Sequence, residues 1–183
     1  LSVPGIHNVL NALACTAIST EYGISKKDIQ DALIKFTGAH RRFEFKGKIN
    51  NNVSVYDDYA HHPDEITATL KTAEHYPHKK LWVVFQPHTY TRTKALLPEF
   101  AKALSEADAV VLADIYAARE KNTLGISSKN LADEIEKLGT EVHYFPTFDE
   151  IENFLLENCN DNDLLITMGA GDVYKIGEKL LGK

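Results

Sequence analysis

Cysteine is scarce in this sequence, with two residues among 183. Cys15 falls within a helical pattern and Cys159 lies near the end of the chain, so the pair lacks the close spacing of a cysteine metal motif. Two thiols in a chain of this length are typical of buried or incidental residues in a reducing compartment. We therefore expect a cytoplasmic protein without a structural zinc site.

Long apolar runs and an excess of positive charge are also absent. No stretch approaches the roughly 20 apolar residues that cross a bilayer. The opening LSVPGIHNVL lacks the basic start and the cleavage site of a signal peptide. The formal net charge is -6 and the pI is about 5.7, which argues against a nucleic-acid-binding surface. We expect neither a membrane nor a nucleic acid as partner, and the sequence leaves the oligomeric state open.

The composition is that of an ordinary globular chain, with 44% hydrophobic and 25% charged residues. Its length allows one domain, or one domain with part of another. The first residue is not methionine, and the chain opens on a segment that resembles a loop leading into a helix. We therefore expect a fragment of a longer protein.

Two helices are predicted in the first 40 residues. The first begins near His7, and its apolar residues recur at helical spacing, which predicts a buried stripe. Asn8 and Asn11 share one face of this helix, which suits either half-exposed helix polarity or contact with the edge of a nucleobase. Ser25 opens a capping pattern for the second helix, and Gly38 ends that helix. The predicted stripe comprises Val9, Leu10, Leu13, Ala14, Ala17 and Ile18.

Strands and helices alternate from Phe43 onwards. A strand pair around the asparagine turn 50–52 precedes a helix from about Pro63. The run LWVVF at 81–85 is typical of a strand buried on both faces. Further helices are expected at 95–104, 131–138, 151–156 and after Gly171, with strands at 109–113, 141–145 and 164–168. The pattern predicts an α/β fold with a doubly wound, mostly parallel sheet and helices on both faces, beginning at a boundary near residues 38–42.

Charged and hydrogen-bonding side chains follow four of the predicted strands. The carboxyl ends of parallel strands meet at one edge of a sheet, which is where open α/β sheets bind ligands. The four segments are DDYAHHP, QPHTYTR, DIYAARE and GAGD. The first three contain the candidate functional side chains Asp58, His61, His88, Arg92, Arg119 and Glu120.

Each of these segments also has a purely structural interpretation. His61 and His62 are adjacent and point apart, so a polar loop with a helix cap explains them as well as ligand contact does. His88 follows a proline and suits a turn, whereas Arg92 suits a helix surface. The glycines of GAG suit either an anion at a helix N-terminus or close packing of helix on strand.

A metal centre is the sharpest alternative for the first segment. Asp57, Asp58, His61 and His62, with His88 nearby, provide oxygen and nitrogen ligands. The sequence contains no HExxH helix and no cysteine spacing of a structural zinc site. The competing hypothesis is an α/β metal-dependent hydrolase that uses Asp58, His61 and His88, whereas we expect no dedicated metal site.

Six segments, taken together and in order, resemble the Mur ligase family: HNVLNALA, GAHRRFE, DDYAHHPDEI, FQPHTYTR, DIYAARE and GAGDVY. The resemblance implies an enzyme of three domains, which bind a UDP-sugar, bind ATP and form a Rossmann-like C-terminal ligase domain. Residues 1–40 would then be the last helices of the ATPase domain and residues 41–183 the whole C-terminal domain. No GxxxxGK[ST] phosphate loop occurs in the chain, so its lysine, the main Mg²⁺ ligands and the uridine pocket are expected upstream.

The resemblance also implies a reaction. DDYAHHP together with FQPH matches the branch of the family that joins L-alanine to UDP-N-acetylmuramate in peptidoglycan precursor synthesis. ATP and Mg²⁺ would activate the muramoyl carboxylate as an acyl phosphate, and the amine would attack it to give an amide, ADP and phosphate. Such an enzyme needs cationic side chains and positioned hydrogen-bond donors. We expect this fragment alone to be inactive.

Two further alternatives remain open. The murein-recycling ligase of the same family attaches a preformed tripeptide to the same sugar nucleotide, and it would need a wider pocket near His88 and Arg119. A nucleotide-binding module without catalytic activity is the other alternative.

Carried over by position, the resemblance assigns roles at the nucleotide. His7, Asn8 and Asn11 would contact adenine, Asp58 would accept hydrogen bonds from the ribose hydroxyls, and Arg42 would approach the phosphates of ATP. The choice of Arg42 over its neighbour Arg41 rests on the alignment of RRF.

A second group would face the amino acid and the acyl phosphate. It comprises Tyr59, His61, His88, Arg92 and Arg119 as substrate-binding residues, and His61, His88 and Arg92 join Arg42 as the expected catalytic residues. Many relatives have an arginine where this chain has Thr89, so Arg92 is left with more of the positive charge.

Overall fold

The computed structural model describes residues 1–49 and 52–183. Six strands form a single sheet in the order β1-β2-β6-β3-β4-β5, in which β1 pairs antiparallel with β2 and the other pairs are parallel. The predicted strand pair and the mostly parallel sheet are therefore confirmed. The strands are β1 (Glu44–Ile49), β2 (Val53–Asp58), β3 (Leu81–Phe85), β4 (Ala109–Leu112), β5 (Glu141–Tyr144) and β6 (Leu164–Met168).

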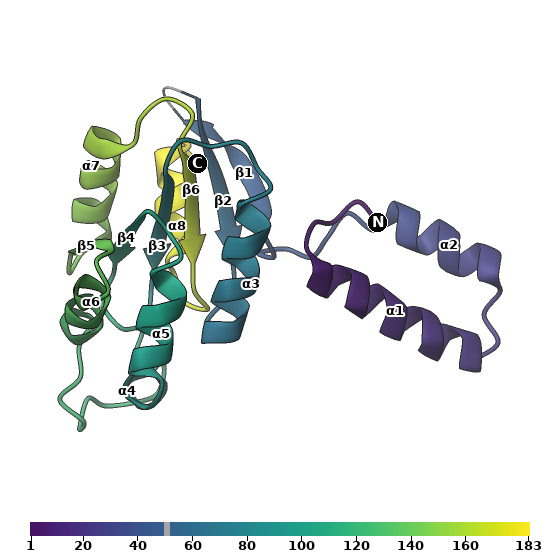
Figure 1. Cartoon of the computed structure of the whole chain (residues 1–183), viewed down its shortest axis with the longest axis horizontal. Coiled ribbons are helices and arrows are strands. Elements are labelled where there is room, and N and C mark those ends of the chain that lie inside the picture. Colours follow the sequence, from purple (N-terminus) through teal and green to yellow (C-terminus); the bar gives the residue numbers. More distant parts are fainter. Residues whose placement is uncertain (50–51) are drawn as a thin grey trace.

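The central strands are apolar because both faces of the sheet are covered (Figure 1). Every residue of β3 and β6 is buried, as the runs LWVVF and LLITM predict. One core cluster lies under α3 (Pro63–Ala73), α5 (Leu97–Leu104) and α6 (Ser128–Lys137), and the other lies under α7 (Phe148–Asn158) and α8 (Tyr174–Leu180). Each large apolar side chain in these clusters contributes roughly 1.5–3 kcal/mol of hydrophobic stabilisation. The predicted doubly wound fold is confirmed.

The predicted helix at 95–104 is confirmed as α5, and a short helix before it was not predicted. This helix, α4, spans Tyr90–Ala95, and α5 begins after Leu96, at Leu97, with Pro98 in its first turn. Proline disfavours a helical conformation in the preceding residue and has no N–H to donate, so a continuous helix cannot pass this point. The end of the QPHTYTR segment therefore belongs to a helix of its own.

The predicted buried stripe on the first helix is wrong. α1 (Ile6–Glu21) packs on α2 (Lys26–Lys35) to form a helical hairpin that stands beside the sheet, joined to it by the linker 36–43 (Figure 1). The helical period was right, but Leu10 and Leu13 are 60% and 61% exposed and no residue of α1 is buried. A stripe becomes buried only where another element covers it, and α2 covers only part of α1.

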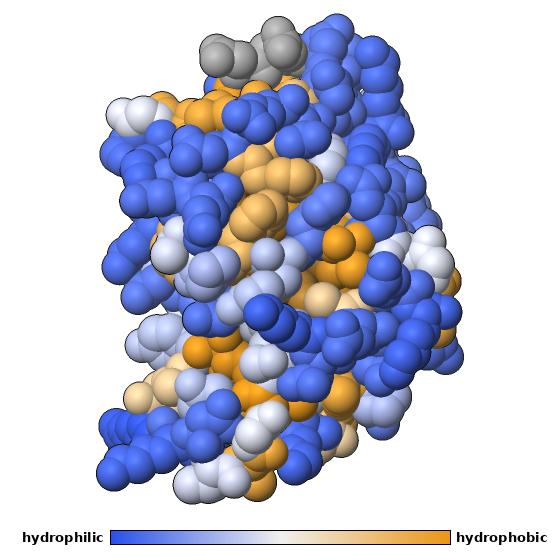
Figure 2. Space-filling view, turned by 90° about the vertical axis from the view of Figure 1, so that its left-hand side faces the viewer, coloured by the Kyte–Doolittle hydropathy of each residue, from blue (hydrophilic) through white to orange (hydrophobic). Residues whose placement is uncertain are grey.

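Two further local predictions are confirmed, because Ser25 caps α2 by accepting a hydrogen bond from the N–H of Asp28 and Pro63 occupies the first turn of α3. The prediction that Gly38 ends the second helix is wrong, because α2 ends at Lys35 with Phe36 as its C-cap. The asparagine turn falls partly on residues 50–51, outside the described residues. Figure 2 shows that the side of the molecule bearing α6 and α7 is mainly hydrophilic. Within 1–49 and 52–183, none of the helices is long and apolar enough to span a bilayer.

Candidate functional site

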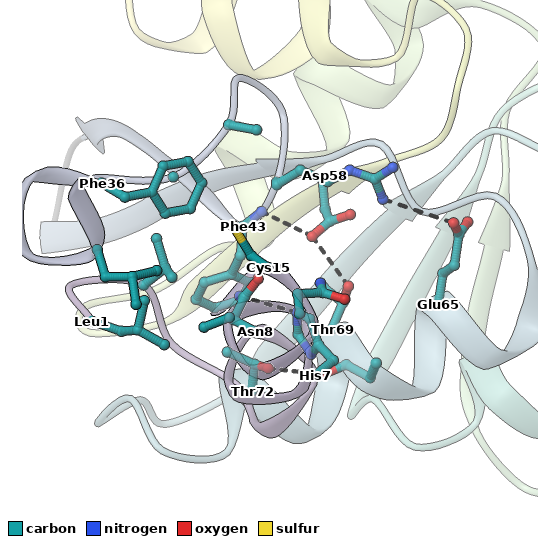
Figure 3. Close-up of a pocket in the computed structure, with 18 of the residues that line it drawn as sticks. Leu1, His7, Asn8, Cys15, Phe36, Phe43, Asp58, Glu65, Thr69 and Thr72 are labelled. Carbon is teal, nitrogen blue, oxygen red and sulfur yellow. Dashed lines mark hydrogen bonds and ion pairs between the residues drawn. The ribbon is translucent and has the colours of Figure 1, made fainter. Parts of the chain in front are cut away.

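A cavity of about 750 Å³ separates the helical hairpin from the sheet (Figure 3). Its walls come from the start of α1, the end of α2, the linker, the carboxyl end of β2 and the first turns of α3. Apolar side chains, among them Leu33, Phe36 and Phe43, line it together with a few polar groups. All five residues expected at the nucleotide line this cavity: His7, Asn8, Asn11, Arg42 and Asp58.

The hairpin side of the cavity presents amides. The side-chain nitrogen of Asn8 donates to the Pro4 carbonyl at 2.6 Å and lies 3.2 Å from the Nε2 atom of His7. Asn11 lies one turn further along α1 and is exposed at the cavity wall. An amide offers both donors and an acceptor, which is what the edge of a nucleobase requires. Leu33 and Phe36 supply apolar surface from α2 beside these amides.

Asp58 is held firmly at the cavity wall. One carboxylate oxygen accepts from the Ala60 N–H at 2.8 Å, and the other accepts from the Phe43 N–H at 2.8 Å and from the Thr69 hydroxyl at 3.1 Å (Figure 3). Burial raises the pKa of Asp58, while these three donors act in the opposite direction. Each carboxylate oxygen can accept two hydrogen bonds, so the oxygen facing Ala60 can still accept one from a ligand.

Arg41 and Arg42 occupy different environments. The Arg41 side chain is 11% exposed and pairs with Asp57, with an Nε–Oδ2 distance of 2.8 Å. Arg42 is 52% exposed, lines the cavity and lies 3.7 Å from a carboxylate oxygen of Glu65. An exposed guanidinium on a cavity wall is free to meet a phosphate, whereas a buried paired one is not. The geometry therefore favours Arg42 at the nucleotide, in agreement with the alignment of RRF.

Four of the five expected substrate residues, all except Arg119, form a second cluster. The rings of Tyr59 and His61 are 5.4 Å apart, and the rings of His61 and His88 are 6.0 Å apart. A guanidinium nitrogen of Arg92 lies 3.5 Å from the His61 carbonyl oxygen. The loop after β2 and the loop after β3 therefore meet at the carboxyl edge of the sheet, although β6 lies between the two strands.

His88 has an unusual environment. Its ring stacks on Tyr116 at 5.5 Å, and its buried Nδ1 atom has no hydrogen-bond partner within the described chain. Burial, followed by the charges of Arg92 and His61, lowers the pKa of His88 below its ordinary value of 6.5. The ring is therefore neutral at pH 7, and a proton on Nε2 leaves the buried Nδ1 as an unpaired acceptor, the less costly arrangement.

Within the QPHTYTR and DIYAARE segments, Thr89 and Arg119 do not belong to the cluster around His61 and His88. Thr89 has a φ of 69°, a strained conformation for a β-branched residue, and its N–H donates to the Tyr116 carbonyl at 2.9 Å. Arg119 is exposed, and within the described chain its side chain makes no hydrogen bond or ion pair. The neighbouring Glu120 links the loop after β4 to the start of α4, because it accepts hydrogen bonds from both the hydroxyl and the N–H of Thr91.

The glycine segment after β6 serves packing. A Cβ atom on Gly169 would lie 2.8 Å from the Gln86 carbonyl oxygen, and one on Gly171 would lie 2.5 Å from the Gln86 side chain. The N–H groups of Gly169 and Asp172 already donate to the Asp58 carbonyl and to Gln86 Oε1. These N–H groups are therefore occupied, which favours close packing over an anion site.

The two adjacent histidines diverge, as expected. His62 caps α3, where its Nδ1 atom accepts from the Asp64 N–H at 3.4 Å, whereas the Nδ1 atom of His61 donates to the Tyr59 carbonyl at 3.0 Å.

Across residues 1–49 and 52–183, no three His, Cys, Asp or Glu side chains are grouped so as to hold a metal ion. Both cysteines are free thiols, with Cys15 exposed and Cys159 buried.

Glu65 and Tyr116 were missed by sequence reasoning. Glu65 accepts from the His61 N–H at 3.0 Å, and it links His61 to Arg42 across the cavity mouth. Burial acts to raise the pKa of Glu65, but that hydrogen bond and the charges of His61 and Arg42 hold it below its ordinary value. The available signal was its place in the first turn of α3, where an acidic residue is ordinarily explained by the helix dipole.

Comparison with known proteins identifies the family. The model of the Mur ligase, glutamate ligase domain matches residues 41–171, the part of the chain that forms the sheet and its helices. The chain belongs to the Mur ligase family. It is 62% identical over all 183 residues to a UDP-N-acetylmuramate–L-alanine ligase of Agathobacter rectalis, of which it spans 40%. The chain therefore spans about two fifths of the length of the curated relatives it matches.

Solved structures of Mur ligases share the fold. The UDP-N-acetylmuramate-alanine ligase of Thermotoga maritima superposes with a TM-score of 0.82 at 35% identity, over 100% of this chain and 38% of that one. A murein peptide ligase of Psychrobacter arcticus superposes with a TM-score of 0.76 at 26% identity, over 99% of this chain and 37% of that one. Both similarities cover the helical hairpin as well as the sheet.

Proposed function

We propose that this chain is the C-terminal part of an ATP-dependent ligase that joins L-alanine to UDP-N-acetylmuramate. The observation that carries the proposal is the cavity between hairpin and sheet, which gathers all five residues assigned to the nucleotide. The relatives at 53–62% identity that bear the name of that ligase point to the same reaction. The cysteine usage keeps our expectation that the enzyme works in the cytoplasm.

The cavity suits ATP in shape and chemistry. Its volume of about 750 Å³ falls within the usual range for small-molecule and cofactor sites. Asn8 and Asn11 would meet the base beside apolar side chains of α2, Asp58 would accept from the ribose, and Arg42 would reach the phosphates. These groups match the apolar faces of the base, the hydroxyls of the ribose and the anionic phosphates respectively.

The neighbouring cluster suits the acyl-transfer end of the reaction. Charge builds up on the acyl phosphate and on the tetrahedral intermediate, so the groups required are donors that are fixed before the reaction starts. Arg92 supplies a cation, and a neutral His88 supplies an Nε2–H donor next to His61. Mg²⁺, which would neutralise phosphate charge, is expected to bind chiefly in the ATPase domain of the longer protein.

We further propose that residues 1–40 belong to that ATPase domain and residues 41–183 form the ligase domain. The family model begins at residue 41, and the hairpin has its own packing with an exposed apolar stripe. An exposed stripe of this size on a helix is typical of a surface that another part of the protein covers. The nucleotide would then lie between two domains and contact both.

The test is a phosphate-release assay on the longer protein. ATP, Mg²⁺ and UDP-N-acetylmuramate are supplied with L-alanine in one sample and with the L-Ala–D-Glu–diamino acid tripeptide in another. We expect phosphate release with L-alanine and none above background with the tripeptide. The isolated 183-residue chain is the control, and it should release no phosphate because the phosphate loop is absent from it.

The other outcomes are equally informative. Release with the tripeptide alone would show that the chain belongs to a recycling ligase. The murein peptide ligase of Psychrobacter arcticus, whose structure resembles this chain, bears a name of that kind. Silence in both samples would contradict the proposed function. Turnover by the isolated chain would contradict the division of the active site between two domains.

A further inference from the structure

The Arg41 side chain does not line the cavity, yet it donates three hydrogen bonds within the fold beside it. Its Nε atom donates to Asp57 at 2.8 Å, and its two terminal nitrogens donate to the carbonyl oxygens of Gly169 at 2.6 Å and Gly171 at 3.2 Å. A single guanidinium thus joins the linker, the end of β2 and the loop after β6. These three segments are far apart in the sequence.

Two aromatic rings enclose the same guanidinium. Its central carbon lies 5.0 Å from the centre of the Tyr59 ring and 4.6 Å from the centre of the Tyr174 ring. Arg42 also approaches the Tyr59 ring, since its central carbon lies 5.8 Å from the same ring centre. Tyr59 also donates its N–H to the Arg41 carbonyl at 2.7 Å. The position of Tyr59, and through it that of Arg42, therefore depends on Arg41.

The backbone around Arg42 is held in a strained conformation. Arg41 has a φ of 57° and Phe43 a φ of 45°, both in the left-handed region that non-glycine residues rarely occupy. These two turns place the side chains of Arg41 and Arg42 in different environments, one buried under the loop after β6 and the other at the cavity. Strain of this kind persists only where surrounding contacts fix it. The Arg41 side chain provides such contacts, together with the hydrogen bonds from the Arg41 N–H to Glu44 and from the Phe43 N–H to Asp58.

We propose that Arg41 is a positioning residue, which fixes the linker on the sheet and so presents Arg42 and Tyr59 to the nucleotide and substrate. The inference rests on the proposed function, because it assumes that Arg42 meets the phosphates of ATP. Arg41 itself touches neither ligand. Its effect on catalysis is transmitted through Arg42.

The test is a double-mutant cycle in the longer protein, with Arg41→Lys and Arg42→Ala as the two changes. Lysine keeps the positive charge beside the buried Asp57 but cannot donate to Asp57 and both glycine carbonyls at once. We expect Arg42→Ala to lower kcat by about 10²-fold, as loss of transition-state charge stabilisation does. We expect Arg41→Lys to lower kcat by about 10-fold or more in the parent and by less than about 2-fold in the Arg42→Ala background, because neighbours that act as a unit are not additive.

A second variant keeps the test possible if Arg41→Lys does not fold. Arg41→Met combined with Asp57→Asn removes both members of the buried ion pair, so no uncompensated charge is left inside. The same cycle is then measured on that background. In both cases the melting temperature of each variant is recorded, so that loss of fold is separated from loss of rate.

The matched control is Lys80→Met. Lys80 also joins an ion pair to an aromatic contact, because it lies 2.7 Å from Glu141 and 3.9 Å from the centre of the Trp82 ring, at the opposite end of the strands. This change should lower stability and leave kcat unaltered. Equal losses from Arg41→Lys in both Arg42 backgrounds, or unchanged kcat in both Arg41 variants, would overturn the inference alone. If Arg42→Ala keeps the parental kcat, the assignment of Arg42 fails, and the proposed function is the part at fault.

Discussion

Arg41 and Arg42 are adjacent, yet one is buried in the protein and the other faces the cavity. His61 and His62 divide in the same way, since His61 faces the substrate cluster and His62 caps α3. A sequence shows that a charged pair is present, but its side chains are distributed by backbone turns such as the φ of 57° at Arg41. The residue types at the site were therefore predictable, whereas the role of Arg41 was not.

His88 gives a prediction about pH at the scale of one residue. Its pKa in the folded protein lies below its ordinary value of 6.5, whereas the unfolded chain keeps the ordinary value. Between these two values the unfolded state binds more protons, so the contribution of His88 to stability is present above pH 6.5 and is lost as the pH falls through the lowered pKa. Between pH 7.5 and pH 5, the free energy of unfolding should fall further in the unaltered chain than in the His88→Gln variant.

Urea unfolding of the isolated chain at the two pH values measures this difference. Other acidic groups contribute to both proteins and cancel in the comparison. The charged neighbours of His88, which are Arg92, His61 and Glu120, stay in place in both. Equal losses of stability in the two proteins would show that His88 titrates in the folded state as it does in the unfolded one.

At the scale of elements, the buried strands were the most predictable feature. The runs at β3 and β6 are continuous and apolar because helices cover both faces, and their bounds agree with the prediction. The helix predicted at 95–104 is confirmed as α5, whereas α4 before it was missed. α4 has six residues and buries Thr93 alone, so it carries no apolar period from which it could be predicted.

The loop after β6 gives a prediction at the element scale. Gly169→Ala places a methyl group 2.8 Å from the backbone oxygen of Gln86, at a φ of 146°. We expect the free energy of unfolding to fall by about 2–4 kcal/mol, from backbone strain and overpacking together. Chemical denaturation of the isolated chain provides the measurement.

The control is Gly139→Ala, at the end of α6. Gly139 also has a positive φ, of 85°, but a Cβ atom there would meet nothing within 4 Å. This variant should lose about 1 kcal/mol from conformation alone. Losses of the same size at both glycines would mean that the close approach of Gln86 does not explain Gly169.

At the scale of the whole molecule, the helical hairpin shows that a sequence pattern does not determine which helix surface becomes buried. The apolar stripe on α1 has the correct period, but its exposure depends on what surrounds it, which no local pattern encodes. The same hairpin closes the cavity, so residues 7–11 lie close to Asp58 despite their separation in sequence. This long-range proximity was expected from the resemblance to the Mur ligases and could not be derived from spacing.

We propose that ATP binds between the hairpin and the sheet. The most direct measurement is a crystal structure of the longer protein with a non-hydrolysable ATP analogue and Mg²⁺. We expect the base to lie beside Asn8 and Asn11, the ribose at Asp58 and the phosphates toward Arg42. A nucleotide bound elsewhere, such as at the Gly169–Gly171 segment, with the cavity empty, would contradict it.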